Sequence, residues 1–218
     1  VNIVMAILFA LFINEIAHPK FKSFVQTVTY MPHFISWVVF GGIVITLLSG
    51  DGGLFNQILL KLGVISQPVV FMAEPKYFWA IAIISNLVKE LGWSTILYTA
   101  AISGVDQELY EAAGIDGAGR LQIIRHVNLP CILPTIIIMF IMSTGSILTV
   151  GFEKIFLLQN DLNLETSRVI STYTYEIGLL GGQFSYSTAI GLFNNVINVI
   201  MLFLSNKIAK KVSGIGLW

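Results

Sequence analysis

Apolar runs alternate with short polar segments along the whole chain. Four runs, at about 33–49, 77–103, 131–152 and 184–206, approach or exceed the roughly 20 residues that a helix needs to cross a bilayer. A fifth run, VNIVMAILFALFI, opens the chain. The pattern predicts an all-α fold, a polytopic transmembrane helical bundle of five helices, in which the first is incomplete and the second is short.

The composition supports a membrane protein. Of the 218 residues, 56% are hydrophobic and 11% are charged, whereas a soluble domain is about a quarter charged. The net charge is zero, so it gives no indication of a nucleic-acid partner. The single cysteine, Cys131, excludes an intrachain disulfide framework, and we interpret it as a small apolar residue at the start of a span.

The opening run has no initiator Met, no basic segment and no cleavage pattern of a signal peptide. We therefore interpret it as all or part of a transmembrane helix, and we expect the chain to lack its N-terminal part.

The distribution of Lys and Arg predicts which segments face the cytoplasm, because cytoplasmic loops carry an excess of both. If the C-terminus with Lys207, Lys210 and Lys211 is cytoplasmic, the segments 104–130 and 17–32 are cytoplasmic as well. Seven of the twelve basic residues then lie inside, and four lie outside, namely Lys61, Lys76, Lys154 and Arg168. On the outer side, we expect a short interfacial helix from Leu54 to Leu62 and a packed helix within 153–183.

The cytoplasmic segment 104–130 is rich in charge, glycine and alanine. Asp106 can cap a helix over 107–114, and Ser103-x-x-Asp106 fits an alternative cap one turn earlier.

Two glycines and a proline are expected to shape the rest of this segment. Gly114 and Gly117 should end the first helix, with Gly117 at positive φ for a sharp reversal. A second helix over 118–127 follows, and Pro130 closes it before the next span. The prediction is a helix–turn–helix that protrudes from the membrane.

This protruding segment also matches a known motif. EAAGIDG, nine further residues and VNLP resemble the EAA loop of binding-protein-dependent ABC importer permeases, which reads E-A-A, three residues, G, nine residues, I, one residue, L-P. Val127 stands where the motif has Ile, a mild departure. The residues of the loop to which the resemblance assigns docking are Glu111, Ala112, Ala113, Asp116, Gly117, Leu129 and Pro130. Asp116 and the alanine that follows Gly117 are similar to the carbohydrate branch of these permeases.

The likeness extends beyond the loop. YMPHFISWVV at 30–39, the stretch that begins GWSTILYTAAISG at 92, and FSYSTAIGLFNNVI at 184–197 resemble polysaccharide and oligosaccharide permeases, in particular the LplB-like group related to maltose-importer subunits. The resemblance implies the type I ABC importer permease fold. Residues 1–218 would form a single transmembrane permease domain, with 104–130 as its cytoplasmic EAA coupling loop.

The resemblance also implies a set of partners and a location. The protein would be a multi-pass subunit of the bacterial cytoplasmic membrane that pairs with a second permease subunit in a heterodimer. Two cytoplasmic ATPase subunits would receive the EAA helix, and an extracellular solute-binding protein would deliver an oligosaccharide or polysaccharide fragment. The alternative is an importer of the same class for another solute, such as glycerol phosphate or a modified monosaccharide. The chain has no G-x-x-x-x-G-K-[ST] loop, so ATP and Mg would be bound by the ATPase partners, and we expect no cofactor in this chain.

Polar residues within the predicted spans are candidates for a substrate path, because charges in a membrane are costly and commonly functional. Lys89 and Glu90 fall within the run 77–103, and Asn86 and Trp93 share a helical face with them at spacings of three, four and seven. The alternative is that Lys89 and Glu90 lie near the outer boundary and extend to water. In the last span, Asn194 and Asn198 lie on one face and fit either saccharide contacts or interhelical hydrogen bonds.

Two other classes of function were considered. His18, His33 and His126 are scattered, without the spacing of a metal site or of a nucleophile and its base, so a membrane-embedded enzyme is disfavoured. A passive channel or structural component would leave the EAA spacing unexplained.

Overall fold

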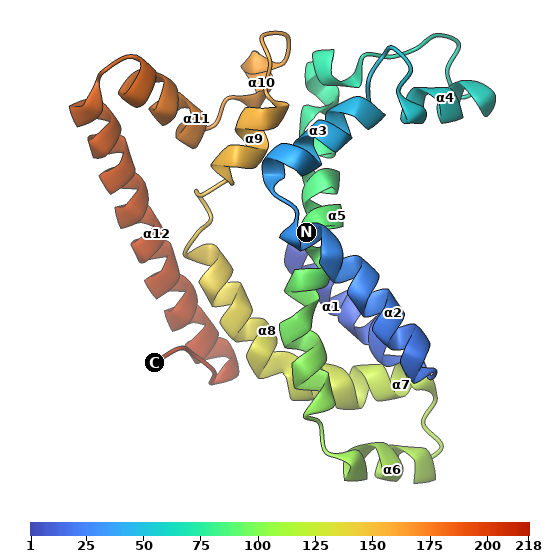
Figure 1. The fold of residues 1–218 in the computed structure, drawn as a ribbon. Coiled ribbons are helices and arrows are strands. Elements are labelled where there is room, and N and C mark those ends of the chain that lie inside the picture. Colours follow the sequence, from blue (N-terminus) through green and yellow to red (C-terminus); the bar gives the residue numbers. More distant parts are fainter. The chain divides into compact units, whose positions relative to one another are not determined.

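The computed structural model describes residues 1–218, and its regular structure is helical throughout. The predicted all-α fold is therefore confirmed. The longest helices are α5 (Pro75–Ser103), α8 (Leu129–Thr144) and α12 (Phe184–Ser213) (Figure 1). The shorter helices are α1 (Asn2–Asn14), α2 (Pro19–Tyr30), α3 (Trp37–Leu47), α4 (Leu54–Lys61), α6 (Gln107–Ile115), α7 (Arg120–Ile123), α9 (Phe152–Leu158), α10 (Leu164–Ser167) and α11 (Ile170–Tyr175). The remaining turns are 3₁₀ helices at Met31–Phe34 and Phe71–Ala73 and π-helical turns at Ile124–Asn128 and Glu176–Leu180.

Three helical stretches are long and apolar enough to cross a membrane, namely Pro75–Ser103, Arg120–Thr144 and Phe184–Ser213. A fourth exists if Pro19–Phe34 and Trp37–Leu47, which meet at a bend of 102°, form one broken span. The first apolar helix, α1, has 13 residues. The runs 77–103 and 184–206 are thus confirmed as helices long and apolar enough to span a membrane, whereas the prediction of five spanning helices is only partly right.

The chain forms two compact units. Unit 1 contains Val1–His33, Glu90–Ile147 and Ile197–Trp218, and unit 2 contains Phe34–Lys89 and Leu148–Val196.

The core of unit 1 consists of small residues of α1 packed against larger ones. Ala6 and Ala10 are buried together with Tyr98, Ile102 and Ile132, which come from α5 and α8. Small side chains allow helix backbones to approach closely, which is the main source of packing energy between helices in lipid. Gly92 likewise allows α5 to approach α2 closely, because a Cβ there would collide with the backbone carbonyl of Thr29 in α2.

In unit 2, α9 packs against α3 and α5. Phe78 and Ala82 of α5 are buried with Ile155 and Leu158 of α9. The turn after α9 is held by Asn163, which is 1% exposed and whose amide donates to the carbonyl oxygens of Met72 (2.9 Å) and Leu158 (3.1 Å).

Two predicted spans have different bounds in the structure. The run 131–152 was expected to be one span, but α8 ends at Thr144. Hydroxyl groups near this end bond to backbone oxygens, as Thr144 does to Ile141 (2.6 Å), and such bonds compete with helix continuation. The α-helix in the run 33–49 begins only at Trp37, because the Ser36 hydroxyl caps α3 by accepting from the Val39 amide.

The outer segments contain helices, as expected, with one difference in detail. α4 confirms the helix predicted from Leu54 to Leu62, with its last helical residue at Lys61. The helix expected within 153–183 is divided into three short α-helices and a π-helical turn. Asn160, which accepts from the amides of Leu162 and Asn163, stabilises one of the turns between them.

Candidate functional site

The candidate docking loop begins with a capped helix, α6. Asp106 is its N-cap, and its carboxylate accepts from the amide of Glu108 at 3.0 Å. The alternative cap at Ser103 does not form, because the Ser103 hydroxyl donates to the Thr99 carbonyl within α5. The predicted cap at Asp106 is confirmed.

The C-terminal end of α6 depends on Gly117. Its φ is +74°, and its amide donates to the Gly114 carbonyl while the Ala118 amide donates to the Ala113 carbonyl. This pair of bonds is a Schellman motif, which requires a left-handed residue that only glycine adopts at little cost. The predicted reversal at Gly117 is confirmed. Gly114 does not end the helix, contrary to the prediction, since α6 continues through Ile115.

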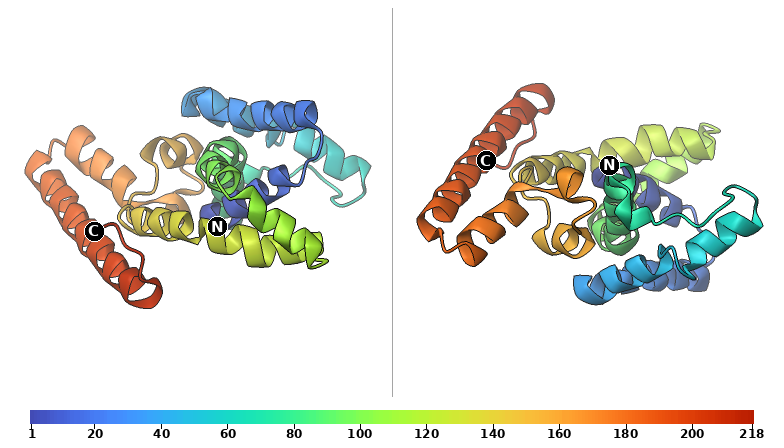
Figure 2. Two further views of the ribbon diagram at one scale, coloured as in Figure 1. Left: turned by 90° about the horizontal axis from the view of Figure 1, so that it is seen from below. Right: turned by 90° about the horizontal axis from the view of Figure 1, so that it is seen from above.

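The second helix of the loop continues into the membrane span. α7, the π-helical turn Ile124–Asn128 and α8 follow one another as one helical stretch from Arg120 to Thr144 (Figure 2). The prediction that Pro130 closes a separate helix is therefore wrong. Proline has no amide hydrogen and crowds the carbonyl four residues earlier, and the wider π turn directly before it accommodates both effects.

The candidate docking residues lie on an elbow, which we define as residues 106–130, and they differ in exposure. Glu111, Ala112, Asp116 and Gly117 are exposed, whereas Ala113 and Leu129 are half-buried and Pro130 is exposed at the start of α8.

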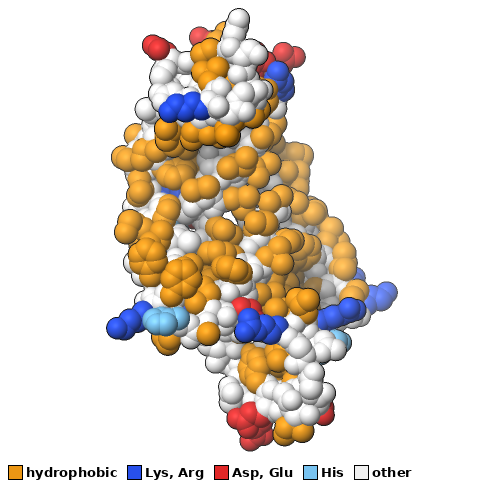
Figure 3. Space-filling model, turned by 90° about the vertical axis from the view of Figure 1, so that its right-hand side faces the viewer, with side chains coloured by type: hydrophobic (Ala, Val, Ile, Leu, Met, Phe, Trp, Pro, Cys, Tyr) orange, Lys and Arg blue, Asp and Glu red, His pale blue; other side chains and the backbone are white.

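The elbow carries both apolar and acidic side chains that are exposed. Ile115 is 87% exposed and Leu121 81% exposed, and Glu108 and Glu111 lie beside Leu109 on α6. Figure 3 shows acidic and hydrophobic groups side by side on the lowest lobe of the protein.

The opposite face of α6 is tied to the span. The Tyr110 hydroxyl donates to Asn128 Oδ1 at 2.5 Å, and Asn128 is 1% exposed. Burial raises the pKa of the Tyr110 hydroxyl above its ordinary value, and the nearby Cys131 and Glu15 add to this.

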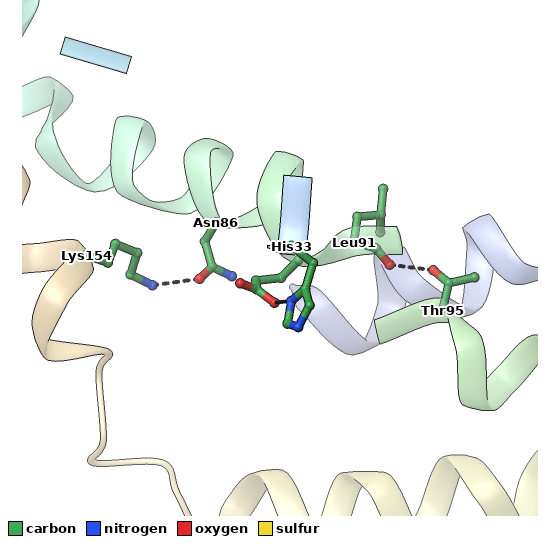
Figure 4. A network of polar contacts seen from close by, with 6 residues as sticks. His33, Asn86, Leu91, Thr95 and Lys154 are labelled. Carbon is green, nitrogen blue, oxygen red and sulfur yellow. Dashed lines mark hydrogen bonds and ion pairs between the residues drawn. The ribbon is translucent and has the colours of Figure 1, made fainter. Parts of the chain in front are cut away.

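In unit 2, the candidate path residues Asn86 and Lys89 lie near a second lysine. The Lys154 ammonium donates to Asn86 Oδ1 at 3.0 Å (Figure 4). Lys89 is 3% exposed, and its Nζ lies 5.4 Å from the centre of the Trp37 ring, while Lys154 Nζ lies 6.0 Å from the same centre. Cations above an indole ring are stabilised by its π electrons.

In unit 1, Glu90 and Trp93 both contact His33. The His33 Nδ1 atom lies 2.6 Å from Glu90 Oε2 (Figure 4), and the His33 ring stacks on Trp93 with 4.3 Å between ring centres. Lys89 and Glu90 occupy the middle of α5.

A cavity of about 490 Å³ lies beside Trp93 in unit 1. It is bounded by residues of α1, α5 and α8 together with the turn that follows α8, among them Trp93, Ser94, Ser143 and Ser146.

Two of the candidate path residues, Asn194 and Asn198, belong to α12. Asn194 Oδ1 is buried and has no hydrogen-bond partner in the structure, and both Asn194 and Asn198 are half-buried. Whether Asn86, Lys89, Glu90, Trp93, Asn194 and Asn198 line one substrate path stays a prediction.

Three side chains that contact candidate site residues or the elbow were not predicted from the sequence. His33 was counted as an isolated histidine, Lys154 was assigned to an outer loop, and Tyr110 was not singled out. Their partners lie 57, 68 and 18 residues away, respectively. No spacing rule for a single helix connects residues so far apart.

The fold and the site define a helical membrane protein with a capped, exposed elbow between two spans. The family is established by direct comparison: residues 2–214 match the family described as "Binding-protein-dependent transport system inner membrane component", and the chain belongs to it. It is thus a component of the inner membrane, as predicted.

Two relatives come from Bacillus subtilis strain 168. The polygalacturonan/rhamnogalacturonan transport system permease protein YteP is 43% identical over 97% of this chain and 65% of its own length. Protein LplB is 39% identical over 97% of this chain and 66% of its own length. The chain thus spans slightly less than two thirds of each relative.

The structural comparison supports the same fold. A chain of a bacterial ABC transporter involved in the import of the acidic polysaccharide alginate is 42% identical, with a TM-score of 0.92 over 96% of this chain and 72% of that chain. The alginate transporter in complex with a periplasmic protein bound to an alginate pentasaccharide gives a TM-score of 0.94 at 41% identity, over 99% of this chain and 74% of that chain. The predicted ABC importer permease fold is confirmed.

Proposed function

We propose that the chain is the transmembrane permease subunit of an ATP-driven, binding-protein-dependent importer for oligosaccharides or polysaccharide fragments. In this proposal, α6 docks to a cytoplasmic ATPase, and closure of the ATPase pair drives alternating access of the membrane helices. The partners are a second permease subunit in a heterodimer, two ATPase subunits that bind ATP and Mg, and an extracellular solute-binding protein.

The exposed elbow is the observation that carries this proposal. α6 is fixed at both ends by its own caps, so its outer surface is presented as a rigid helix in water. Ile115, at 87% exposed, has no role in the core of this chain. A capped helix with apolar and acidic residues on its outer side is suited to insertion into a groove of another protein.

Uptake into proteoliposomes tests the assignment. The wild-type chain and its partner chains are reconstituted with internal MgATP and an external binding protein, and uptake of labelled oligogalacturonate is measured. Glu111→Ala should reduce both uptake and the amount of ATPase that copurifies. Glu165→Ala, which removes an exposed carboxylate of α10, is the matched control and should change neither. Full uptake by Glu111→Ala would contradict docking through α6.

We further propose that the saccharide is acidic. Lys89 and Lys154 place two ammonium groups near one indole ring in unit 2, and a carboxylate-bearing sugar would be attracted to that charge. The similarity to a transporter of the acidic polysaccharide alginate supports the same class. In unit 1, the cavity beside Trp93 offers an aromatic ring and serine hydroxyls, which match the apolar faces and hydroxyls of a sugar.

ATPase stimulation separates the substrate classes. Binding protein with trigalacturonate should stimulate the assembled transporter, and maltotriose or glycerol phosphate should not. Lys154→Met should weaken the response to trigalacturonate. Stimulation by maltotriose alone would contradict the acidic class while leaving the importer assignment intact.

A further inference from the structure

The contact between Tyr110 and Asn128 has a role beyond the stability of the loop. α6 is connected to the spans by two turns, at Ser103–Asp106 and at Asp116–Gly119. Its backbone bonds at both ends are local, so these turns alone do not fix its position against the span. The hydrogen bond from Tyr110 to Asn128 is the side-chain bond that joins the middle of α6 to the helix behind it.

Asn128 is placed where a displacement would be transmitted to the membrane. It is the last residue of the π-helical turn and directly precedes α8. It is 1% exposed, and its Nδ2 atom is buried without a partner, so its side chain is enclosed by protein. A π turn offers an irregularity at which the helix can change its hydrogen-bond register.

We propose that the Tyr110–Asn128 hydrogen bond is the positioning link through which movement of α6 reaches α8. Tyr110 and Asn128 are positioning residues: they hold α6 against the start of α8, and neither contacts the substrate. This inference rests on the proposed function, since it takes α6 as the helix that a docked ATPase moves.

Three variants separate a mechanical role from a structural one. Tyr110→Phe removes the donor and leaves Asn128 Oδ1 buried without its partner, which is costly. Tyr110→Phe with Asn128→Leu removes both polar groups, and such paired replacement is close to neutral for stability. Tyr175→Phe makes the same chemical change in α11, where the tyrosine packs against Phe152 and Phe156.

The native cysteine provides a reporter on the receiving helix. Cys131 is exposed, lies three residues after Asn128 and is the one cysteine of the chain. The transporter is assembled with cysteine-free partner chains, and the rate at which Cys131 reacts with a maleimide is measured with and without MgATP and vanadate. Copurification of the ATPase and the melting temperature are measured in parallel.

The link predicts a specific combination of results. In the wild-type chain and in Tyr175→Phe, MgATP changes the labelling rate. Tyr110→Phe reduces this change about fivefold, the factor that corresponds to one typical hydrogen bond. The double variant has the melting temperature of the wild-type chain and still copurifies with the ATPase. Its labelling rate nevertheless shows the same reduced response to MgATP as Tyr110→Phe.

Two outcomes overturn the inference and are distinguishable. If the double variant, or Tyr110→Phe itself, shows the full MgATP response, the link is wrong while docking through α6 stands. If the wild-type chain shows no response although the ATPase copurifies, the coupling mechanism in the proposed function fails, and the link fails with it.

Discussion

Adding one methyl group to α6 should have opposite effects at two neighbouring glycines. Gly117 has φ +74°, whereas Gly114 lies within the helix, and a Cβ at either position would meet no atom within 4 Å. Packing therefore does not distinguish the two sites, and the backbone conformation decides the result.

The magnitudes follow from the conformation of each residue. Gly117→Ala forces a side chain into the left-handed region at a cost of about 1–2 kcal/mol. Gly114→Ala stabilises the helix by about 0.5–1 kcal/mol, because alanine loses less backbone entropy than glycine. Since 1.4 kcal/mol is a factor of ten, amide exchange in the last turn of α6 should become about 5- to 30-fold faster in Gly117→Ala and about 2- to 5-fold slower in Gly114→Ala.

Hydrogen exchange followed by mass spectrometry measures both effects in the detergent-solubilised protein. The informative amides are those of Gly117, or Ala at that position, and Ala118, whose bonds close the Schellman motif. Peptides from α12 serve as an internal reference and should be unchanged in both variants. Unchanged exchange in Gly117→Ala, or faster exchange in Gly114→Ala, would refute the assignment of Gly117 as the cap of α6.

Three further changes test the packing and the proposed interface. Gly92→Ala should lower the melting temperature of the solubilised protein, because its Cβ collides with the Thr29 carbonyl and overpacking costs about 1–3 kcal/mol; an unchanged value would show that α2 and α5 do not approach closely. Asn163→Ala should lower it by a similar amount, since it removes the bonds to Met72 and Leu158, and a stable variant would contradict that turn. Ile115→Ser should leave the melting temperature unchanged but reduce ATPase copurification, and the reverse result would place Ile115 in the core rather than at an interface.

Local signals in the sequence predicted much of the elbow. The cap at Asp106 and the reversal at Gly117 depend on residues within one or two turns, so residue type and spacing were sufficient. The long apolar runs likewise gave α5 and α12, because only length and composition are needed to identify a span.

The incorrect predictions have physical causes that length and composition alone do not reveal. Proline lacks an amide hydrogen, so Pro130 predicts a helix end, but a π turn directly upstream accommodates it. The run 131–152 is apolar on average, so length and composition predict one span, whereas the hydroxyls of Ser143 and Thr144 bond to backbone oxygens where α8 ends. His33 and Glu90 are brought together by the packing of α2 and its 3₁₀ turn on α5, which depends on close contact at Gly92.

Site-specific crosslinking from α6 tests the central claim most directly. Ala112 is an exposed motif residue of α6, and Leu133 is an exposed residue of α8. Each is replaced by cysteine in a Cys131→Ser chain that is assembled with cysteine-free partner chains. The thiol is then labelled with a maleimide that carries a benzophenone, and irradiation joins the benzophenone to a C–H group within its reach. We expect Ala112→Cys to form a crosslink to the ATPase subunit, in an amount that changes with MgATP, and Leu133→Cys to form none. Absence of that crosslink from Ala112→Cys in a complex that contains the ATPase would contradict the account.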